Sequence, residues 1–182
     1  MISADLNRFI EIVLHILNKS GGTDAYHLFK ILYFAEMSHI SDWGVSFIPD
    51  EFKARTNGPV PELLYASICQ QSKPTTDFAK SLWGAIESAQ EDAKSILLPK
   101  RHADYDFISP SELEALDKSI DENINLSFEA LRNKSHDHAW EKAYNSHDSH
   151  IISALDMAQV CTVNEGMAEY IKDQLAINKM LQ

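Results

Sequence analysis

Long apolar runs, cysteine and basic clusters are all scarce in this chain of 182 residues. The longest uninterrupted apolar run, Ile31 to Ala35, falls far short of the roughly 20 residues that span a bilayer. Residues 1–5 lack the basic segment and apolar run of a secretory signal. Two cysteines, Cys69 and Cys161, provide neither a disulfide framework nor a repeated metal spacing. We therefore predict a cytoplasmic protein with two reduced core thiols and no membrane partner.

Positive charge is sparse as well. The chain has 16 Lys and Arg residues against 27 Asp and Glu residues, which gives a formal net charge of -11. Its densest basic group is Lys100-Arg101, whereas nucleic-acid binding gains most of its affinity from Lys and Arg side chains that neutralise phosphates. Direct contact with DNA or RNA is therefore not expected. A basic protein partner is favoured instead, because complementary charge steers encounter.

Motifs for catalysis are also missing. The six glycines are scattered, and the chain contains neither a Gly-rich phosphate loop nor a Gly-x-Ser-x-Gly nucleophile elbow. Either cysteine could be combined with a histidine on paper, but so could those of any chain with this composition. We therefore predict a protein that is not an enzyme and needs no cofactor.

One cluster of metal-binding residue types lies within residues 136–150. Neutral imidazole and carboxylate are the usual protein ligands of zinc. Known metal motifs place their ligands on a defined element, whereas this cluster straddles a predicted short helix and a loop. Surface histidines and helix caps explain the same residues, so no metal site is predicted. The alternative is a metal-dependent enzyme that uses His136, His138, His147 and His150 with Asp137 and Asp148 beside them.

Helical periodicity dominates what the sequence does contain. Over residues 4–19, apolar side chains recur at three- and four-residue steps, with Ser3 as the cap and Gly21-Gly22 at the end. A second helix, over about residues 25–41, follows the capping pair Thr23-Asp24. Its middle is apolar almost all round, which is typical of a helix covered on most sides. We predict that this helix lies buried at the centre of a bundle.

Breaks in the helical rhythm predict loops and short strands. Residues 44–58 predict an irregular loop with room for a short hairpin, and residues 58–61 predict the start of a third helix that ends at Lys73-Pro74. Residues 96–99 and 105–108 are predicted to pair as a hairpin across residues 100–104. A fourth helix is expected to begin at Asp77 and to carry Phe78, Leu82, Ile86 and Ala89.

A capping box marks a further helix. Ser109 stands at the cap position, Pro110 at the first helical position and Glu112 at the third. Without repeats or shifts in composition, we predict one domain over residues 1–182, mainly α, with one or two short β-hairpins. Further short helices are expected after Ser127 and around Trp140, with a longer one over about 165–181. Three tryptophans are expected in the core: Trp43, Trp83 and Trp140.

Two stretches contain more than helical periodicity. The first is Lys30-Ile31-Leu32-Tyr33-Phe34-Ala35, followed by Phe47, Asp50, Phe52, Gly58-Pro59-Val60 and Tyr65. The second is Ser135-His136 with Ala139-Trp140. Together they resemble the Panacea domain, also called the SocA-like antitoxin domain, a family that includes phage-associated proteins. Two positions depart from the pattern, because Arg55 stands where the family often has Trp and Glu36 where it often has His. The spacing from His136 to Trp140 is also one residue shorter.

The matched residues are expected to have structural roles. Gly58 can supply a positive φ ahead of a rigid proline. Tyr33 and Tyr65 can bury their rings while their hydroxyls form hydrogen bonds. Lys30 lies in an otherwise apolar helix and must reach a partner, for which Asp50 is the candidate, either to hold the loop on the bundle or to bind a partner directly. The motif residues assigned to the scaffold are Lys30, Tyr33, Gly58, Pro59, Val60, Tyr65, His136 and Trp140.

The resemblance implies an antitoxin of a type II toxin–antitoxin system, encoded beside a toxic protein that it neutralises by direct binding. One branch of the family acts as an adaptor that delivers the bound toxin to an ATP-dependent protease, and this is the first alternative. Irregular loops on rigid helices often carry recognition, so the exposed loop from Trp43 to Asn57 is predicted to contact the toxin. The expected contact residues are Trp43, Phe47, Asp50, Phe52, Arg55 and Asn57.

Overall fold

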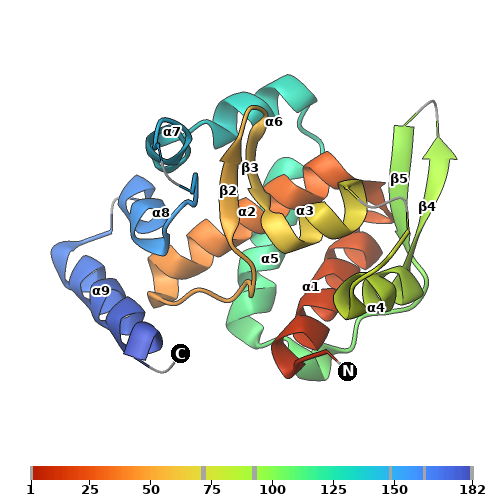
Figure 1. Ribbon diagram of the computed structural model, residues 1–182, viewed down its shortest axis with the longest axis horizontal. Coiled ribbons are helices and arrows are strands. Elements are labelled where there is room, and N and C mark those ends of the chain that lie inside the picture. The colour runs from red at the N-terminus through yellow and green to blue at the C-terminus, as the bar shows by residue number, and fades with distance from the viewer. Residues whose placement is uncertain (1, 71–72, 92–93, 148, 162, 181–182) are drawn as a thin grey trace.

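The computed structural model describes residues 2–70, 73–91, 94–147, 149–161 and 163–180. Helices dominate this part of the chain, which confirms the mainly α prediction (Figure 1). The helices are α1 (Ala4–Ser20), α2 (Ala25–Trp43), α3 (Glu62–Cys69), α4 (Asp77–Ala85), the 3-10 turn η1 (Tyr105–Phe107), α5 (Pro110–Asn123), α6 (Phe128–Ser135), α7 (His138–Tyr144), α8 (Ala154–Val160) and α9 (Glu165–Met180). The strands are β1 (Thr23–Asp24), β2 (Phe52–Arg55), β3 (Gly58–Pro61), β4 (Ile86–Glu91) and β5 (Lys94–Pro99).

The first two helices begin at their predicted caps and α1 ends at its predicted glycine, whereas α2 extends to Trp43, two residues beyond its predicted end. Ser3 accepts a hydrogen bond from the first turn of α1, which Gly21 terminates with a φ of 73°. The Asp24 carboxylate accepts from the backbone N–H of His27 at 2.9 Å and so begins α2. Gly44 ends α2 with a φ of 72°. Both helices therefore use left-handed glycines as terminators.

All the described α-helices except α6 contribute buried side chains to one hydrophobic cluster. Within α2, the apolar side chains Leu28, Ile31, Leu32 and Ala35 have no exposed surface. This burial follows from the neighbours of α2, which are β1, β3, β5, α5, α6 and α8. Among the described residues, no helix is both long and apolar enough to cross a membrane.

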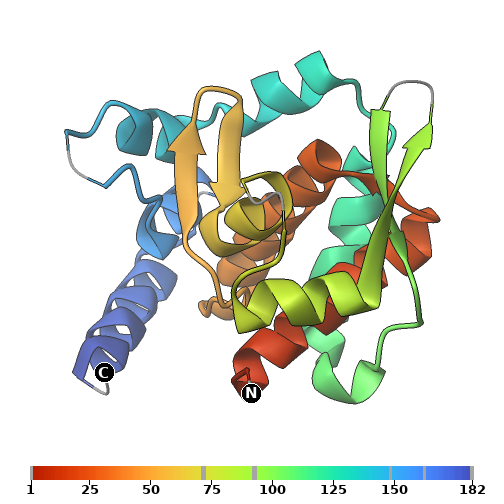
Figure 2. The same cartoon turned by 45° about the vertical axis from the view of Figure 1, so that its right-hand side comes forward.

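Two small antiparallel sheets lie on either side of α3 (Figure 2). One is the β2–β3 hairpin, in which Arg55 pairs with Gly58. The other has the order β1-β5-β4, with Thr23 of β1 opposite Leu97 of β5. The short hairpin expected within the 44–58 loop is thus present, although it extends to Pro61.

The hairpin predicted between residues 96–99 and 105–108 is wrong. β5 turns back onto β4 instead, and α4 ends at Ala85, so that Ile86 and Ala89 lie in a strand rather than on a helix. The segment after β5 is held against α1, because the Glu11 carboxylate accepts from the Arg101 guanidinium and from the backbone N–H of Asp104 at 2.8 Å. Because this ion pair holds residues 101–107 against α1, they do not pair with β5.

The third helix also begins and ends differently from the prediction. Residues 58–61 form β3, and α3 starts at Glu62 and ends at Cys69. The Asp50 carboxylate accepts from the backbone N–H groups of Leu63 and Leu64 at 3.0 Å each, and so satisfies donors that the helix start leaves unpaired. An acidic cap thirteen residues upstream in sequence, rather than the nearby prolines, sets the start of this helix.

Five of the residues expected in the core are not fully buried: Trp43, Trp83, Trp140, Cys69 and Cys161. Trp43 is 55% exposed, and Cys69 is exposed at the end of α3; for both residues the prediction was wrong. Trp83 and Trp140 are partly buried and pack against the hydrophobic cluster. The Trp83 indole also donates to the backbone carbonyl of Ser67 at 3.0 Å, which explains why it sits at the rim of the core.

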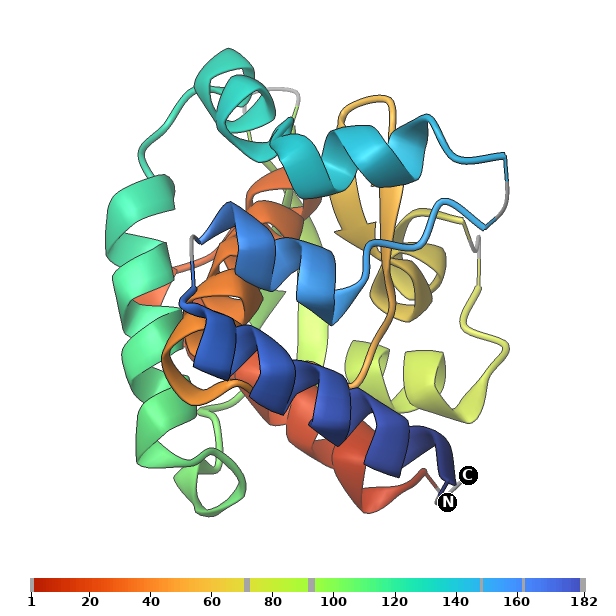
Figure 3. The ribbon, with the colours of Figure 1, turned by 90° about the vertical axis from the view of Figure 1, so that its left-hand side faces the viewer.

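The C-terminal helices α8 and α9 pack against each other on one side of the molecule (Figure 3). α9 also covers the end of α2, where it approaches Gly44 closely. A Cβ atom at Gly44 would lie 2.6 Å from Cδ1 of Tyr170 and 2.8 Å from Sδ of Met167. Gly44 thus terminates one helix and makes room for another.

We expect Gly44→Ala to destabilise the protein more than Gly21→Ala does. The two glycines have nearly the same φ, 72° and 73°, so both substitutions impose the same left-handed strain. Only Gly44 has α9 against it, since nothing lies within 4 Å of a Cβ at Gly21. Overpacking should lower the free energy of unfolding by about 1–3 kcal/mol more for Gly44→Ala. Urea unfolding of both variants measures the difference, and equal losses would show that α9 does not rest on Gly44.

Candidate partner-binding surface

Four polar side chains on α2 are buried, although their neighbours are apolar. They are spaced three residues apart: Lys30, Tyr33, Glu36 and His39, with exposed fractions of 0%, 0%, 2% and 4%. We call this set the polar ladder. Lys30, Glu36 and His39 form hydrogen bonds with the chain between residues 45 and 59, and the Tyr33 hydroxyl binds Asp137.

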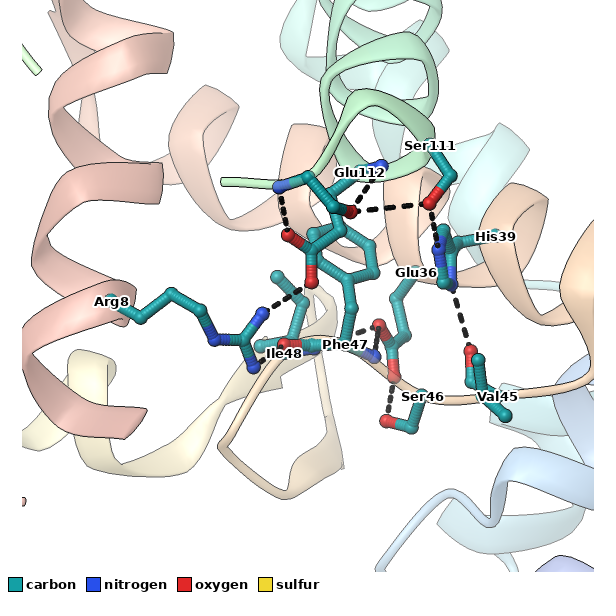
Figure 4. Close-up of polar contacts among 10 residues, drawn as sticks. Arg8, Glu36, His39, Val45, Ser46, Phe47, Ile48, Ser111 and Glu112 are labelled. Atoms are coloured by element: carbon teal, nitrogen blue, oxygen red, sulfur yellow. Dashed lines mark hydrogen bonds and ion pairs between the residues drawn. The ribbon is translucent and has the colours of Figure 1, made fainter. Parts of the chain in front are cut away.

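Glu36 fixes the beginning of that segment (Figure 4). Its carboxylate accepts from the Ser46 hydroxyl and from the backbone N–H groups of Phe47 and Ile48, both at 3.1 Å. Burial raises the pKa of Glu36 from 4.5 to about 7, against the opposing effect of these three donors. The loop therefore encloses the Glu36 carboxylate and shields it from solvent.

His39 and Arg8 hold the same loop from two other directions (Figure 4). His39 Nδ1 lies 2.9 Å from the Val45 carbonyl oxygen, and its Nε2 lies 3.3 Å from the Ser111 hydroxyl. The Arg8 guanidinium donates to the Phe47 carbonyl at 2.7 Å and to the Glu112 carboxylate. Residues 45–48 are thereby tied to α1, α2 and α5 together.

Glu112 has a second role, which confirms the capping box. It accepts from the backbone N–H of Ser109 at 2.8 Å, while the Ser109 hydroxyl accepts from the backbone N–H of Glu112. The helix cap of α5 and the Arg8 contact therefore share one carboxylate.

Lys30 fixes the far end of the segment. Its Nζ donates to the Pro59 carbonyl oxygen at 2.7 Å and lies 4.7 Å from the centre of the Tyr26 ring. The predicted Lys30–Asp50 pair is wrong, because Asp50 caps α3 and no ion pair of Lys30 is present in the described residues. Burial lowers the pKa of Lys30 from 10.5 to about 7.

Gly58 lets the hairpin lie on Lys30. Its φ is 100°, as predicted, and a Cβ there would lie 2.5 Å from the Ser135 hydroxyl oxygen and 3.0 Å from Lys30 Nζ. Any larger side chain would separate β3 from α2 and α6. The matched glycine is therefore required by close approach as well as by its backbone conformation.

Tyr33 connects the ladder to the late motif. Its ring is buried against Phe52, with centroids 5.4 Å apart, and its hydroxyl donates to the Asp137 carboxylate at 2.9 Å. Burial and the Asp137 charge keep the pKa of Tyr33 well above its ordinary value, so the phenol remains a donor. Asp137 also caps α7 by accepting from the backbone N–H of Trp140 at 2.9 Å.

The late motif in turn holds the hairpin. The Trp140 indole donates to the Arg55 carbonyl oxygen at 3.0 Å, and the His136 ring stacks on the Trp140 ring with centroids 3.7 Å apart. The Tyr65 ring, which is half-buried, lies under the Arg55 guanidinium, 4.4 Å from its carbon to the ring centre. Motif residues that are far apart in sequence thus converge on β2 and β3.

The histidine cluster does not form a metal site in the described residues. His136 is used in stacking, and burial together with the Arg132 and Lys30 cations lowers its pKa. His150 Nδ1 contacts the Ala143 carbonyl oxygen at 3.1 Å. His138 and His147 are exposed, and Asp148 lies outside the described residues. No group of three or more His, Cys, Asp or Glu that could hold an ion occurs where the structure is described.

The predicted contact loop is only partly a surface. Phe47 and Phe52 are each 3% exposed, so their assignment to an exposed loop is corrected: the polar ladder draws both rings into the core. Asp50 is half-buried as the cap of α3, and Arg55 is half-buried with its guanidinium on the Glu62 carboxylate at 2.8 Å. Trp43 and Asn57 are exposed, at the two ends of the segment.

One pocket brings motif and predicted contact residues together beside the hairpin turn. Its volume is about 480 Å³. The residues that line it include Tyr26, Lys30, Arg55, Asn57, Gly58, Val60 and Tyr65. The lining combines backbone and aromatic groups with the Lys30 amine, the Arg55 guanidinium and the Cys69 thiol.

The motif residues hold a loop and a hairpin against one buried helix in a mainly helical chain. This arrangement is that of a binding scaffold. A family model described as the antitoxin SocA-like, Panacea domain matches residues 28–141. This match covers more than half of the chain, which therefore belongs to that family, as its motifs indicated. Membership supports an antitoxin-like role. Searches of curated proteins and of solved structures found no match.

We expect Lys30→Met to flatten the dependence of stability on pH above neutrality. Because the pKa of Lys30 is lower in the folded protein than in the unfolded chain, the unfolded chain binds more protons between pH 7 and 10.5. The free energy of unfolding of the wild type should therefore contain a component that rises over this range and is lost as pH falls. Denaturant unfolding at pH 7, 8 and 9 measures it.

The matched control for Lys30→Met is Lys80→Met, on the exposed side of α4. It should preserve the slope of the wild type. If Lys30→Met retains that slope too, the buried amine is not the group that titrates.

Glu36→Gln is expected to remove a component of opposite sign. The pKa of Glu36 is higher in the folded protein, so the folded state binds more protons between pH 4.5 and about 7. Its contribution to stability is full below pH 4.5 and is lost as pH rises to about 7. The amide also cannot accept all three hydrogen bonds, which should cost about 1–3 kcal/mol. Exposed Glu114→Gln on α5 should change neither quantity, and unfolding curves from pH 5 to 7 compare them.

Proposed function

We propose that this protein is the antitoxin of a type II toxin–antitoxin system, acting in the cytoplasm by direct binding to a cognate protein toxin encoded beside it. The observation that carries the proposal is the family match over residues 28–141, whose motif residues hold one loop and hairpin in place. Such a frame keeps a binding surface rigid, which limits the entropy lost on binding.

Steric occlusion is the mechanism that this frame supports. Buried polar contacts fix residues 45–59, while Trp43 and Asn57 remain accessible at the ends of the segment. No step of bond making is needed if the bound antitoxin covers the active or substrate-binding site of the toxin. Within the 136–150 cluster, His136 stacks on Trp140 and His150 contacts a backbone carbonyl, which supports a binding role rather than a catalytic one.

Charge supports a basic partner surface. The net charge of -11 attracts a protein with exposed Lys and Arg and repels nucleic-acid phosphates. We therefore expect the complex to form faster at low salt, because complementary potentials mainly accelerate association.

Co-expression tests the proposal. We expect the neighbouring open reading frame to stop growth when expressed alone, and this chain to restore growth and to co-purify with its product. A growth-arresting protein from an unrelated system, which this chain should leave active, is the control for specificity. Absence of toxicity from either neighbour, or toxicity without rescue, would contradict the antitoxin proposal.

The same cultures separate steric inhibition from delivery to a protease. With simple occlusion, the toxin should persist in the complex at a constant level after synthesis is stopped. If the chain acts as an adaptor for an ATP-dependent protease, toxin should disappear faster in its presence, and a protease-deficient host should abolish that loss. Pulse-chase measurement of toxin half-life distinguishes the two.

A further inference from the structure

The apolar face of α9 is wider than the part of it that is covered. Ile171 is 1% exposed, and Met167 and Leu175 pack partly buried against the core. Beside this covered face, Tyr170 is 45% exposed and Ile177 is 48% exposed. Residues seven apart lie on the same side of a helix, about 10 Å from each other. A helix with an apolar row left open in this way lacks a partner for that row.

Trp43 extends the open row beyond α9. The Tyr170 ring rests on Gly44, where a Cβ would lie 2.6 Å from its Cδ1 atom. The residue before Gly44 is Trp43, which is 55% exposed. We call the surface formed by Trp43, Tyr170 and Ile177 the α9 patch.

The polar ladder holds the aromatic end of the α9 patch in place. The Trp43 ring stacks near the His39 ring, with centroids 6.5 Å apart, and His39 is itself fixed by Val45 and Ser111. Exposed aromatic side chains that are positioned before binding are the usual anchors of protein interfaces, because little conformational freedom is lost when they are covered.

An acidic row borders the α9 patch. Glu165, Glu169 and Asp173 are exposed and four residues apart, so they form one row along the side of the helix next to Tyr170 and Ile177. Asp42 is exposed beside Trp43. The exposed Lys172 lies across the helix from the apolar row, about 200° around the axis from Tyr170.

This charge pattern selects among possible occupants. A second copy of the chain would bring its own acidic row against the first, which like-charge repulsion disfavours. An anionic lipid surface would be repelled for the same reason. An apolar groove edged by Lys and Arg complements both rows of α9.

The position of α9 relative to the family match is also informative. The match ends at residue 141, whereas α9 begins at Glu165, so the α9 patch joins Trp43 from the shared region to a helix outside it. The helix that carries most of the patch can therefore differ between members that share the matched region.

We infer that the α9 patch is the surface on which the toxin docks, and that the toxin presents to it an apolar groove bordered by basic side chains. This inference rests on the proposed antitoxin function and adds the location and chemistry of the contact. Trp43 and Tyr170 fill the groove, and the acidic row faces its basic edge.

The test uses the full chain and the purified product of the neighbouring open reading frame that stops growth. We expect the double variant Tyr170→Ser/Ile177→Ser to raise the dissociation constant at least about 30-fold, as for other interface anchors. Trp43→Ala should have a comparable effect. The control variant Lys172→Ser, across the same helix, should change the constant less than about twofold. Tyr170 also packs on Gly44 and Trp43 on His39, so binding is compared at a temperature at which circular dichroism shows every variant to be folded.

Charge reversal provides an independent measurement. Glu169→Lys/Asp173→Lys should slow association about tenfold or more at low salt and reduce its salt dependence, with a smaller effect on dissociation. Stopped-flow association at several salt concentrations gives both rates.

The outcomes separate the inference from the proposed function. If the wild type rescues growth and the double variant binds the toxin with an unchanged dissociation constant, the α9 patch is not the docking surface and the antitoxin function stands. If the wild type neither rescues growth nor binds, both fall. If the chain alone forms a dimer that the double variant abolishes, a second copy occupies the patch and the inference is overturned.

Discussion

The structure depends on the burial of polar groups along α2. An unpaired polar group in a protein interior costs about 1–3 kcal/mol, so Lys30, Glu36 and His39 can be buried only if acceptors and donors meet them there. Residues 45–59 meet this requirement by running along the helix in the opposite direction, with Val45 opposite His39 and Pro59 opposite Lys30. The burial of the loop and the burial of the polar side chains of α2 therefore depend on each other.

Other parts of the fold are attached to this pairing. The Arg8 guanidinium links the loop to α1 and, through Glu112, to the cap of α5. Tyr33 links α2 to the start of α7 through its hydrogen bond to Asp137. Charge-assisted hydrogen bonds such as these are stronger and more directional than neutral ones, which favours one arrangement of the elements over others of similar hydrophobic burial.

Features governed by neighbours in sequence were predictable, whereas those governed by distant partners were not. Both ends of α1, the start of α2 and the capping box at Ser109 follow from local hydrogen-bonding rules and are confirmed. The β4–β5 pairing was missed because Ile86 also fits a helical apolar spacing, and the competing ion pair between Glu11 and Arg101 joins residues ninety positions apart.

The candidate site shows the same division. The family motif and the need for glycine at position 58 could be recognised from the sequence. The sequence did not indicate which atom accepts the hydrogen bond from the Lys30 amine. Charge alone suggested Asp50, yet that carboxylate satisfies the backbone of α3, and a carbonyl oxygen takes its place. A usable signal was present, since Lys30, Glu36 and His39 interrupt an apolar helix at multiples of three. The exposure of Tyr170 beside Trp43 depends on how α9 packs, for which the local pattern carries no information.

Several contacts that place the loop and hairpin, from the polar ladder and from Trp140, are made with main-chain atoms. Lys30 and His39 contact carbonyl oxygens, Glu36 binds two backbone N–H groups, and the Trp140 indole binds the carbonyl of Arg55. Every residue type carries a carbonyl and all but proline carry the N–H, so outward side chains of the loop can be exchanged without loss of the contacts that place it. The consequence is that outward-facing side chains, such as Asn57, can be exchanged at constant backbone geometry, which would allow one frame to be adapted to different partners.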